Sequence, residues 1–151
     1  MMKTKYFPSL LILLSITVCY CLPFKVGFPD NAFGSLYFHF FHANIFHLAV
    51  NMIALWQFAP RPLTCVIAFV SATLASLLPF AGVSEPTYGL SAFLFAAYAR
   101  KYVSWHLSPK WLILSNLFLA FIPHMNWRIH ILSFVISYAF WHVYYRNRHT
   151  T

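Results

Sequence analysis

The chain has 151 residues, of which 61% are hydrophobic, 21% are aromatic and only 8% are charged. A typical soluble domain carries about 25% charged residues, so the composition excludes an ordinary water-facing surface and predicts a polytopic membrane protein. The net charge of +8 would indicate nucleic acid as a partner of a soluble protein, but the positions of the charges account for it without nucleic acid. Three cysteines (Cys19, Cys21 and Cys65) show no C-x-x-C spacing, so neither a disulfide framework nor a zinc site is expected.

Apolar segments separated by short polar or proline-containing loops predict six helices in a single domain that spans residues 1–151. About 20 apolar residues cross a bilayer, and the fifth apolar segment, 111–123, is short for this. The first segment follows a basic start and lacks a small-x-small cleavage site, so we interpret it as a retained transmembrane helix rather than a signal peptide. The predicted helices cover about residues 6–24, 35–59, 63–80, 88–103, 108–124 and 126–145.

The basic residues test this count of six, because cytoplasmic loops of membrane proteins are enriched in Lys and Arg. With six spans, one side of the membrane receives eight basic residues, and the other receives only Lys25 and Arg128 together with both acidic residues. Both termini are therefore expected in the cytoplasm. We expect a multi-pass integral protein of a bacterial inner membrane, with the lipid bilayer and not nucleic acid as its partner. The eight basic residues are Lys3, Lys5, Arg61, Arg100, Lys101, Lys110, Arg146 and Arg148.

The second predicted helix contains polar residues inside an apolar run. His42, His47 and Asn51 lie between Tyr37 and Phe58, a stretch without any Asp, Glu, Lys or Arg. His47 and Asn51 are four residues apart and therefore share one helical face. Polar groups at membrane depth often mark a functional interior, so this face is expected to point at protein rather than at lipid.

Ser91 and His130 lie near the starts of the fourth and sixth predicted helices, which begin on the same side as the second. Three helices would thus bring a hydroxyl, two imidazoles and an amide to a similar depth, as a serine hydrolase requires. A serine hydroxyl needs a base to take its proton, and histidine can do so at neutral pH. Gly89 would allow a close approach to Ser91, and Phe95, one turn further along, is expected to pack under the His130 ring.

Three motifs follow one another on the second, fourth and sixth predicted helices: His42-x4-His47-Leu48-x2-Asn51-Met52-x2-Leu55-Trp56, Gly89-x-Ser91 and His130-x2-Ser133-x3-Ser137. Together they resemble the rhomboid family of intramembrane serine proteases. The resemblance implies an all-α membrane protein, a six-transmembrane-helix rhomboid-like bundle that cleaves transmembrane protein substrates without a cofactor. It also implies that Ser91 is the nucleophile and His130 its base. By the same resemblance His47 and Asn51, with the Ser91 backbone amide, would stabilise the oxyanion.

Two other functions stay open at this point. The rhomboid pattern usually has Gly at the positions of Ala92, Ser133 and Ser137, which leaves room for a catalytically weak or inactive protein. Such a protein would act as a binding or chaperone module. The other function is haem or metal binding by histidines of the second and sixth helices, since imidazole pairs bind such cofactors. No carboxylate or thiolate assists there, so we expect neither a metal nor another cofactor.

Overall fold

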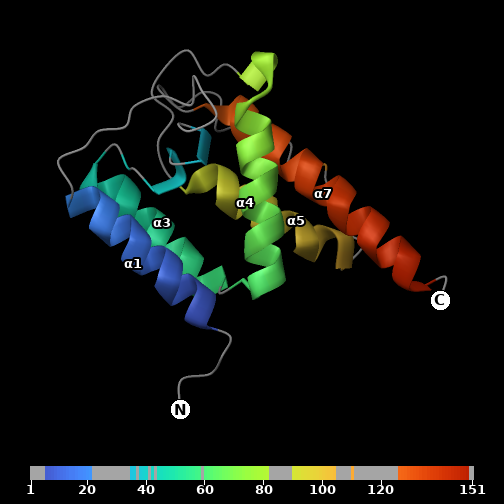
Figure 1. Ribbon diagram of the computed structural model, residues 1–151, viewed down its shortest axis with the longest axis horizontal. Helices are drawn as coiled ribbons and strands as arrows, with labels where there is room; N and C mark the ends of the chain where they lie inside the picture. Colours follow the sequence, from blue (N-terminus) through green and yellow to red (C-terminus); the bar gives the residue numbers. More distant parts are fainter. Residues whose placement is uncertain are drawn as a thin grey trace.

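The computed structural model is a bundle of α-helices (Figure 1). It describes residues 6–21, 35–36, 38–40, 42, 44–58, 60–81, 90–104, 110 and 126–149. The α-helices of this part are α1 (Phe7–Cys21), α3 (Ile45–Phe58), α4 (Pro62–Ser76), α5 (Ser91–Ser104) and α7 (Trp127–His149), and the 3₁₀ helices are η2 (Phe38–Phe40) and η3 (Pro79–Ala81).

Short-range signals in the sequence set where these helices begin. The Asn44 side-chain oxygen accepts a hydrogen bond from the His47 amide at 2.8 Å, which caps the first turn of α3. Asn126 accepts in the same way from the Ile129 amide at 3.4 Å at the start of α7. Helix α4 begins at Pro62, whose missing N–H would have no partner in a first turn in any case. The caps therefore hold the first turns of α3 and α7 in place.

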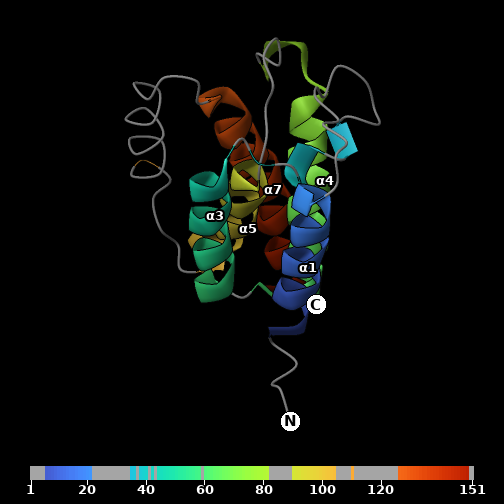
Figure 2. The same cartoon turned by 90° about the vertical axis from the view of Figure 1, so that its left-hand side faces the viewer.

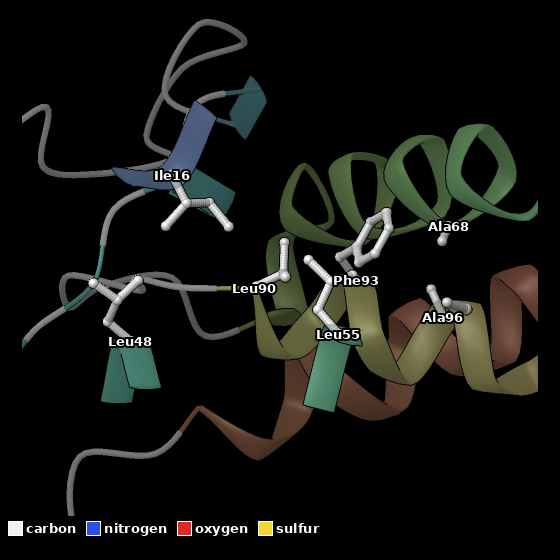
Figure 3. Close-up of a cluster of buried hydrophobic side chains, with 8 residues drawn as sticks. Ile16, Leu48, Leu55, Ala68, Leu90, Phe93 and Ala96 are labelled. Atoms are coloured by element: carbon white, nitrogen blue, oxygen red, sulfur yellow. The ribbon is translucent and has the colours of Figure 1, made fainter. Parts of the chain in front are cut away.

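Helices α4, α5 and α7 pack against one another, and α1 and α3 lie at the flank of the bundle away from α7 (Figures 1 and 2). The most extensive packing joins α5 to α7, and α4 packs against both, whereas α3 makes few contacts with α1 and α5. Figure 3 shows apolar side chains of four helices meeting in one buried cluster. Burial of this apolar surface is the main force that holds the helices together.

Small residues allow α7 to approach α5 closely. Ser133 and Ser137 are fully buried on α7. The Ser137 hydroxyl donates across the contact to the Ala96 carbonyl of α5 at 2.7 Å, while the Ser133 hydroxyl donates to the Ile129 carbonyl of its own helix. A buried hydroxyl with a partner avoids the cost of an unsatisfied polar group, so both serines fit the contact.

Large apolar side chains stay exposed on the outer faces of the bundle. On α3, for example, Phe46 is 76% exposed and Ile45 is 64% exposed. Similar side chains lie on α1, α4 and α7, including Leu14, Val66 and Val143. The described residues therefore leave part of the apolar surface of these helices uncovered.

The prediction of six transmembrane helices is wrong for the described chain. Helices α1, α3, α4 and α5 have only 14 or 15 residues. At 1.5 Å per residue they reach about 21–23 Å, against a hydrocarbon core of about 30 Å. Helix α7 has 23 residues, but Arg128 and Arg146 bound its uncharged stretch, and His130 and His142 lie within it. None of the described helices combines the length and the hydropathy that crossing a membrane requires.

This finding overturns three linked expectations: the six-transmembrane-helix rhomboid-like bundle, the cytoplasmic placement of both termini, and the multi-pass localisation in a bacterial inner membrane. The second predicted helix, 35–59, is divided in the structure, because η2 comes first and α3 begins only at Ile45, after the Asn44 cap. The fifth predicted helix, 108–124, lies outside the described residues except for residue 110.

Candidate active site

Helices α3, α5 and α7 begin at the same end of the bundle (Figures 1 and 2). His47 is the third residue of α3, Ser91 the first of α5 and His130 the fourth of α7. The first turn of a helix carries a positive partial charge from its unpaired N–H groups. The position of Ser91 thus favours negative charge that develops on or beside its oxygen.

The Ser91 hydroxyl contacts two side chains of α3. It donates to the Asn51 side-chain oxygen at 3.3 Å, and the His47 Nε2 lies 3.3 Å from the same hydroxyl oxygen. A hydroxyl has only one proton to donate. With this proton on Asn51, the second contact is a hydrogen bond in the tautomer of His47 that carries its hydrogen on Nε2. In that tautomer His47 directs an N–H group at the serine oxygen.

His130 is a buried imidazole held by a ring contact. Its ring stacks on Phe95, one turn beyond Ser91 on α5, with centroids 5.0 Å apart and planes 3° from parallel. Burial, and after it the charge of His47, lower the pKa of His130 to about 4. His130 is therefore neutral at pH 7, the form that accepts a proton. No hydrogen bond joins Ser91 and His130 among the described residues.

Asn51 and His130 each carry a buried polar atom without a partner. Asn51 is 5% exposed and its Nδ2 has no hydrogen bond to any described residue; the same holds for Nδ1 of His130, which is 6% exposed. Buried polar groups in native proteins nearly always have partners. A partnerless amide N–H beside a serine hydroxyl suits an oxygen that becomes negative during a reaction.

His42 lies against His47 at the edge of this arrangement. The two rings are 5.2 Å apart between centroids and inclined at 64°. Neither ring nitrogen of His42 has a hydrogen bond of good geometry with a described residue. Burial first, then the charge of His47, lower the pKa of His42 to about 4, and the Phe40 carbonyl opposes this in part.

The predicted site residues are thus placed in three ways. The structure gathers Ser91, His47 and Asn51 in direct contact, with His42 against His47. Phe95 packs on His130 one turn away. Ser137 bonds to the Ala96 carbonyl of α5 and Ser133 to a carbonyl of its own helix, and the glycine at 89 lies outside the described residues. The catalytic roles of all these residues stay predictions.

Histidines are the main candidates for metal ligands. In the described part of the chain, no group of three or more His, Cys, Asp or Glu side chains could hold a metal ion. Burial lowers the pKa of His47 and raises that of Cys65 to about 11. The thiol of Cys65 therefore stays protonated at neutral pH and does not offer a thiolate ligand.

Acid is expected to destabilise the fold, because buried histidines resist protonation. Burial lowers the pKa of His39 from 6.5 to about 3, and those of His42 and His130 lie near 4. At these three histidines the unfolded chain binds protons as the pH falls below 6.5, whereas the folded chain does so only near pH 4, or near pH 3 at His39. Stability is therefore complete above pH 6.5 and declines as the pH falls from there towards 4.

Replacing His39 by Phe should make this decline shallower. Phenylalanine keeps ring contacts with Phe38 and Phe69 but does not titrate, although it loses the 3.4 Å contact of His39 with Thr73. The loss of unfolding free energy between pH 6.5 and 4.5 should shrink by on the order of 2 kcal/mol. Urea unfolding at both pH values measures it, with the exposed His142→Phe as control. Equal pH dependence in His39→Phe and wild type would contradict the assignment.

Comparison with known proteins identifies no relative of this chain. A scan against models of protein families finds no match, and a search of curated proteins finds none either.

Proposed function

We propose that the chain is a serine endopeptidase in which Ser91 attacks the peptide carbonyl and His130 takes its proton. The observation that supports this most directly is the Ser91 hydroxyl at the first turn of α5, in contact with His47 and Asn51. A neutral, ring-stacked imidazole lies one turn away. These side chains suit hydrolysis of an acyl bond. The peptide as acyl group follows from the resemblance to rhomboid proteases, and so do transmembrane substrates and a lipid partner, which remain predictions.

Each side chain has one role in the proposed reaction. The Ser91 hydroxyl leaves the Asn51 oxygen and turns so that its proton passes to His130 as its oxygen bonds to the carbonyl carbon. The carbonyl oxygen, now negative, accepts from the His47 Nε2–H and, once its amide has turned, from the Asn51 Nδ2–H. His130 returns the proton to the leaving amine. Water then hydrolyses the acyl-enzyme, with His130 as base again.

Labelling by a fluorophosphonate tests the proposal without a known substrate. The probe phosphonylates a serine only where a base and oxyanion donors activate it. Purified wild-type protein should take up one adduct, and mass spectrometry should locate it on Ser91. Ser91→Ala should take up none, whereas the exposed Ser104→Ala on the same helix should label like wild type. An adduct in Ser91→Ala, or none in wild type, would overturn the proposal.

A second candidate is a binding module without catalysis. One observation favours it: in the structure the Ser91 proton rests on Asn51, and no hydrogen bond leads from Ser91 to His130 among the described residues. A hydroxyl held in this way is a poor nucleophile. The same labelling experiment separates the two candidates, because a binding module would leave the probe unreacted.

A further inference from the structure

His42 is the side chain at the site to which the proposed reaction assigns no task. Both of its ring nitrogens are buried, and apart from an interaction with the Phe40 backbone that lacks good hydrogen-bond geometry they have no partner among the described residues. Desolvated polar atoms of this kind are costly, and in native proteins they need an explanation. Its ring lies 5.2 Å from that of His47, which in turn contacts the Ser91 hydroxyl. The partnerless nitrogens therefore stand next to the place where a substrate would react.

The protonation state of His42 indicates what kind of group it can bind. Burial and the neighbouring His47 lower its pKa to about 4, so the ring is neutral at pH 7. A neutral imidazole has one N–H donor and one bare nitrogen acceptor. An anion such as a carboxylate has no hydrogen to donate, so it would leave the bare nitrogen without a partner. A peptide main chain offers one C=O and one N–H per residue, which matches the imidazole on both sides.

We infer that His42 is a substrate-binding residue that pairs with the main chain of an extended polypeptide next to the scissile bond. The inference rests on the proposed function and specifies the form in which substrate enters: unfolded chain, whose C=O and N–H groups are free. A folded helix is excluded, because its backbone groups already bond to one another. Main-chain pairing also carries little sequence preference, since every residue presents the same two groups.

Protection from the fluorophosphonate measures this binding. Unfolded casein supplies extended chain of many sequences. The quantity measured for each variant is the casein concentration that lowers its labelling rate to half of its own rate without casein. In His42→Phe, which keeps a ring against His47, this concentration should rise about 10-fold or more, as expected for one or two lost hydrogen bonds. In His42→Gln, whose amide has both a donor and an acceptor, it should stay within about 3-fold of wild type.

His142→Phe is the matched control, because His142 is exposed on α7 and lies against Tyr138 instead of the site. It should be protected at the wild-type concentration. A second measurement does not depend on whether the His42→Phe variant folds. In an NMR titration of Ser91→Ala, which keeps His42, the ¹⁵N imidazole signals of His42 should shift when casein is added. A purely structural role for His42 predicts no such shift.

Several results would overturn the inference. They are wild-type protection in His42→Phe, equal impairment of His42→Gln and His42→Phe, and imidazole signals that do not respond to casein. Casein that fails to protect wild-type protein would also overturn it, while labelling at Ser91 would leave the serine endopeptidase proposal standing. Failure of wild-type protein to label at all would remove the proposed function and this inference together.

Discussion

His130→Gln is expected to lower the rate of peptide-bond hydrolysis about 10²- to 10⁴-fold, the usual contribution of a general base. Glutamine keeps a polar side chain of similar length, but its amide does not take up a proton at neutral pH. His47→Gln should cost less, about 10-fold, because an amide N–H can still donate to the oxyanion. Cleavage of casein by the purified variants measures both rates. The opposite order would assign the proton acceptor to His47, the imidazole that contacts Ser91 in the structure.

The pH profile gives these two variants a second readout. The base works in its neutral form, so the wild-type rate should be lost as the pH falls through the His130 pKa of about 4. The charge of His47 is one of the causes that lower this pKa. Removing that charge in His47→Gln should therefore raise the pKa and move the acid limb to higher pH. An unchanged limb would show that the charge of His47 does not act on the group that controls the rate.

Spacing along the sequence was enough to predict which site residues share a face. His47 and Asn51, four residues apart, both reach the Ser91 hydroxyl, and Phe95, one turn from Ser91, stacks on His130. These relations depend on the 3.6-residue period of a helix, which is a local property of the chain. Their validity does not require the overall fold to be predicted correctly.

The extent of each helix was harder to predict, because an apolar run does not show where a helix begins. The run from 35 to 59 reads as one span, yet the Asn44 cap starts α3 only at Ile45 and leaves 14 residues. The choice between capping and continuing a helix depends on a single side-chain hydrogen bond worth about 1 kcal/mol. Composition does not resolve differences of that size, so the second and third predicted helices extend beyond α3 and α4, whereas the sixth, 126–145, stops short of the end of α7 at His149.

The sequence also did not allow a prediction of which side chain accepts the hydrogen bond of the Ser91 hydroxyl. Three candidate partners, His47, Asn51 and His130, lie at the same end of the bundle, and the motif resemblance implies the last. Which of them receives the proton depends on the serine rotamer and on how α3 packs against α5, a contact of few residues. Rotamers of a hydroxyl differ by little energy, so this preference follows from packing rather than from residue type.

Ser137→Leu is expected to lower the unfolding free energy by about 3 kcal/mol or more, through overpacking and one lost hydrogen bond. Ser137 is fully buried, and its hydroxyl bonds across the contact between α7 and α5 to the Ala96 carbonyl. A leucine there must push the two helices apart. The melting temperature should fall by roughly 6–12 °C, while Ser137→Ala, which only loses the bond, should cost about 1 kcal/mol.

The matched control for this substitution is Ser104→Leu. Ser104 also bonds to a helix carbonyl, that of Lys101 at 3.2 Å, but it is exposed at the end of α5. Without neighbours to displace, leucine at this position should change stability by less than about 0.5 kcal/mol. Because His130 and Phe95 meet across the same helix pair, Ser137→Leu should also slow labelling at Ser91 below the melting transition. Equal effects of leucine at 137 and 104 would mean that α5 and α7 are not in close contact, and the His130–Phe95 stack would lose its support.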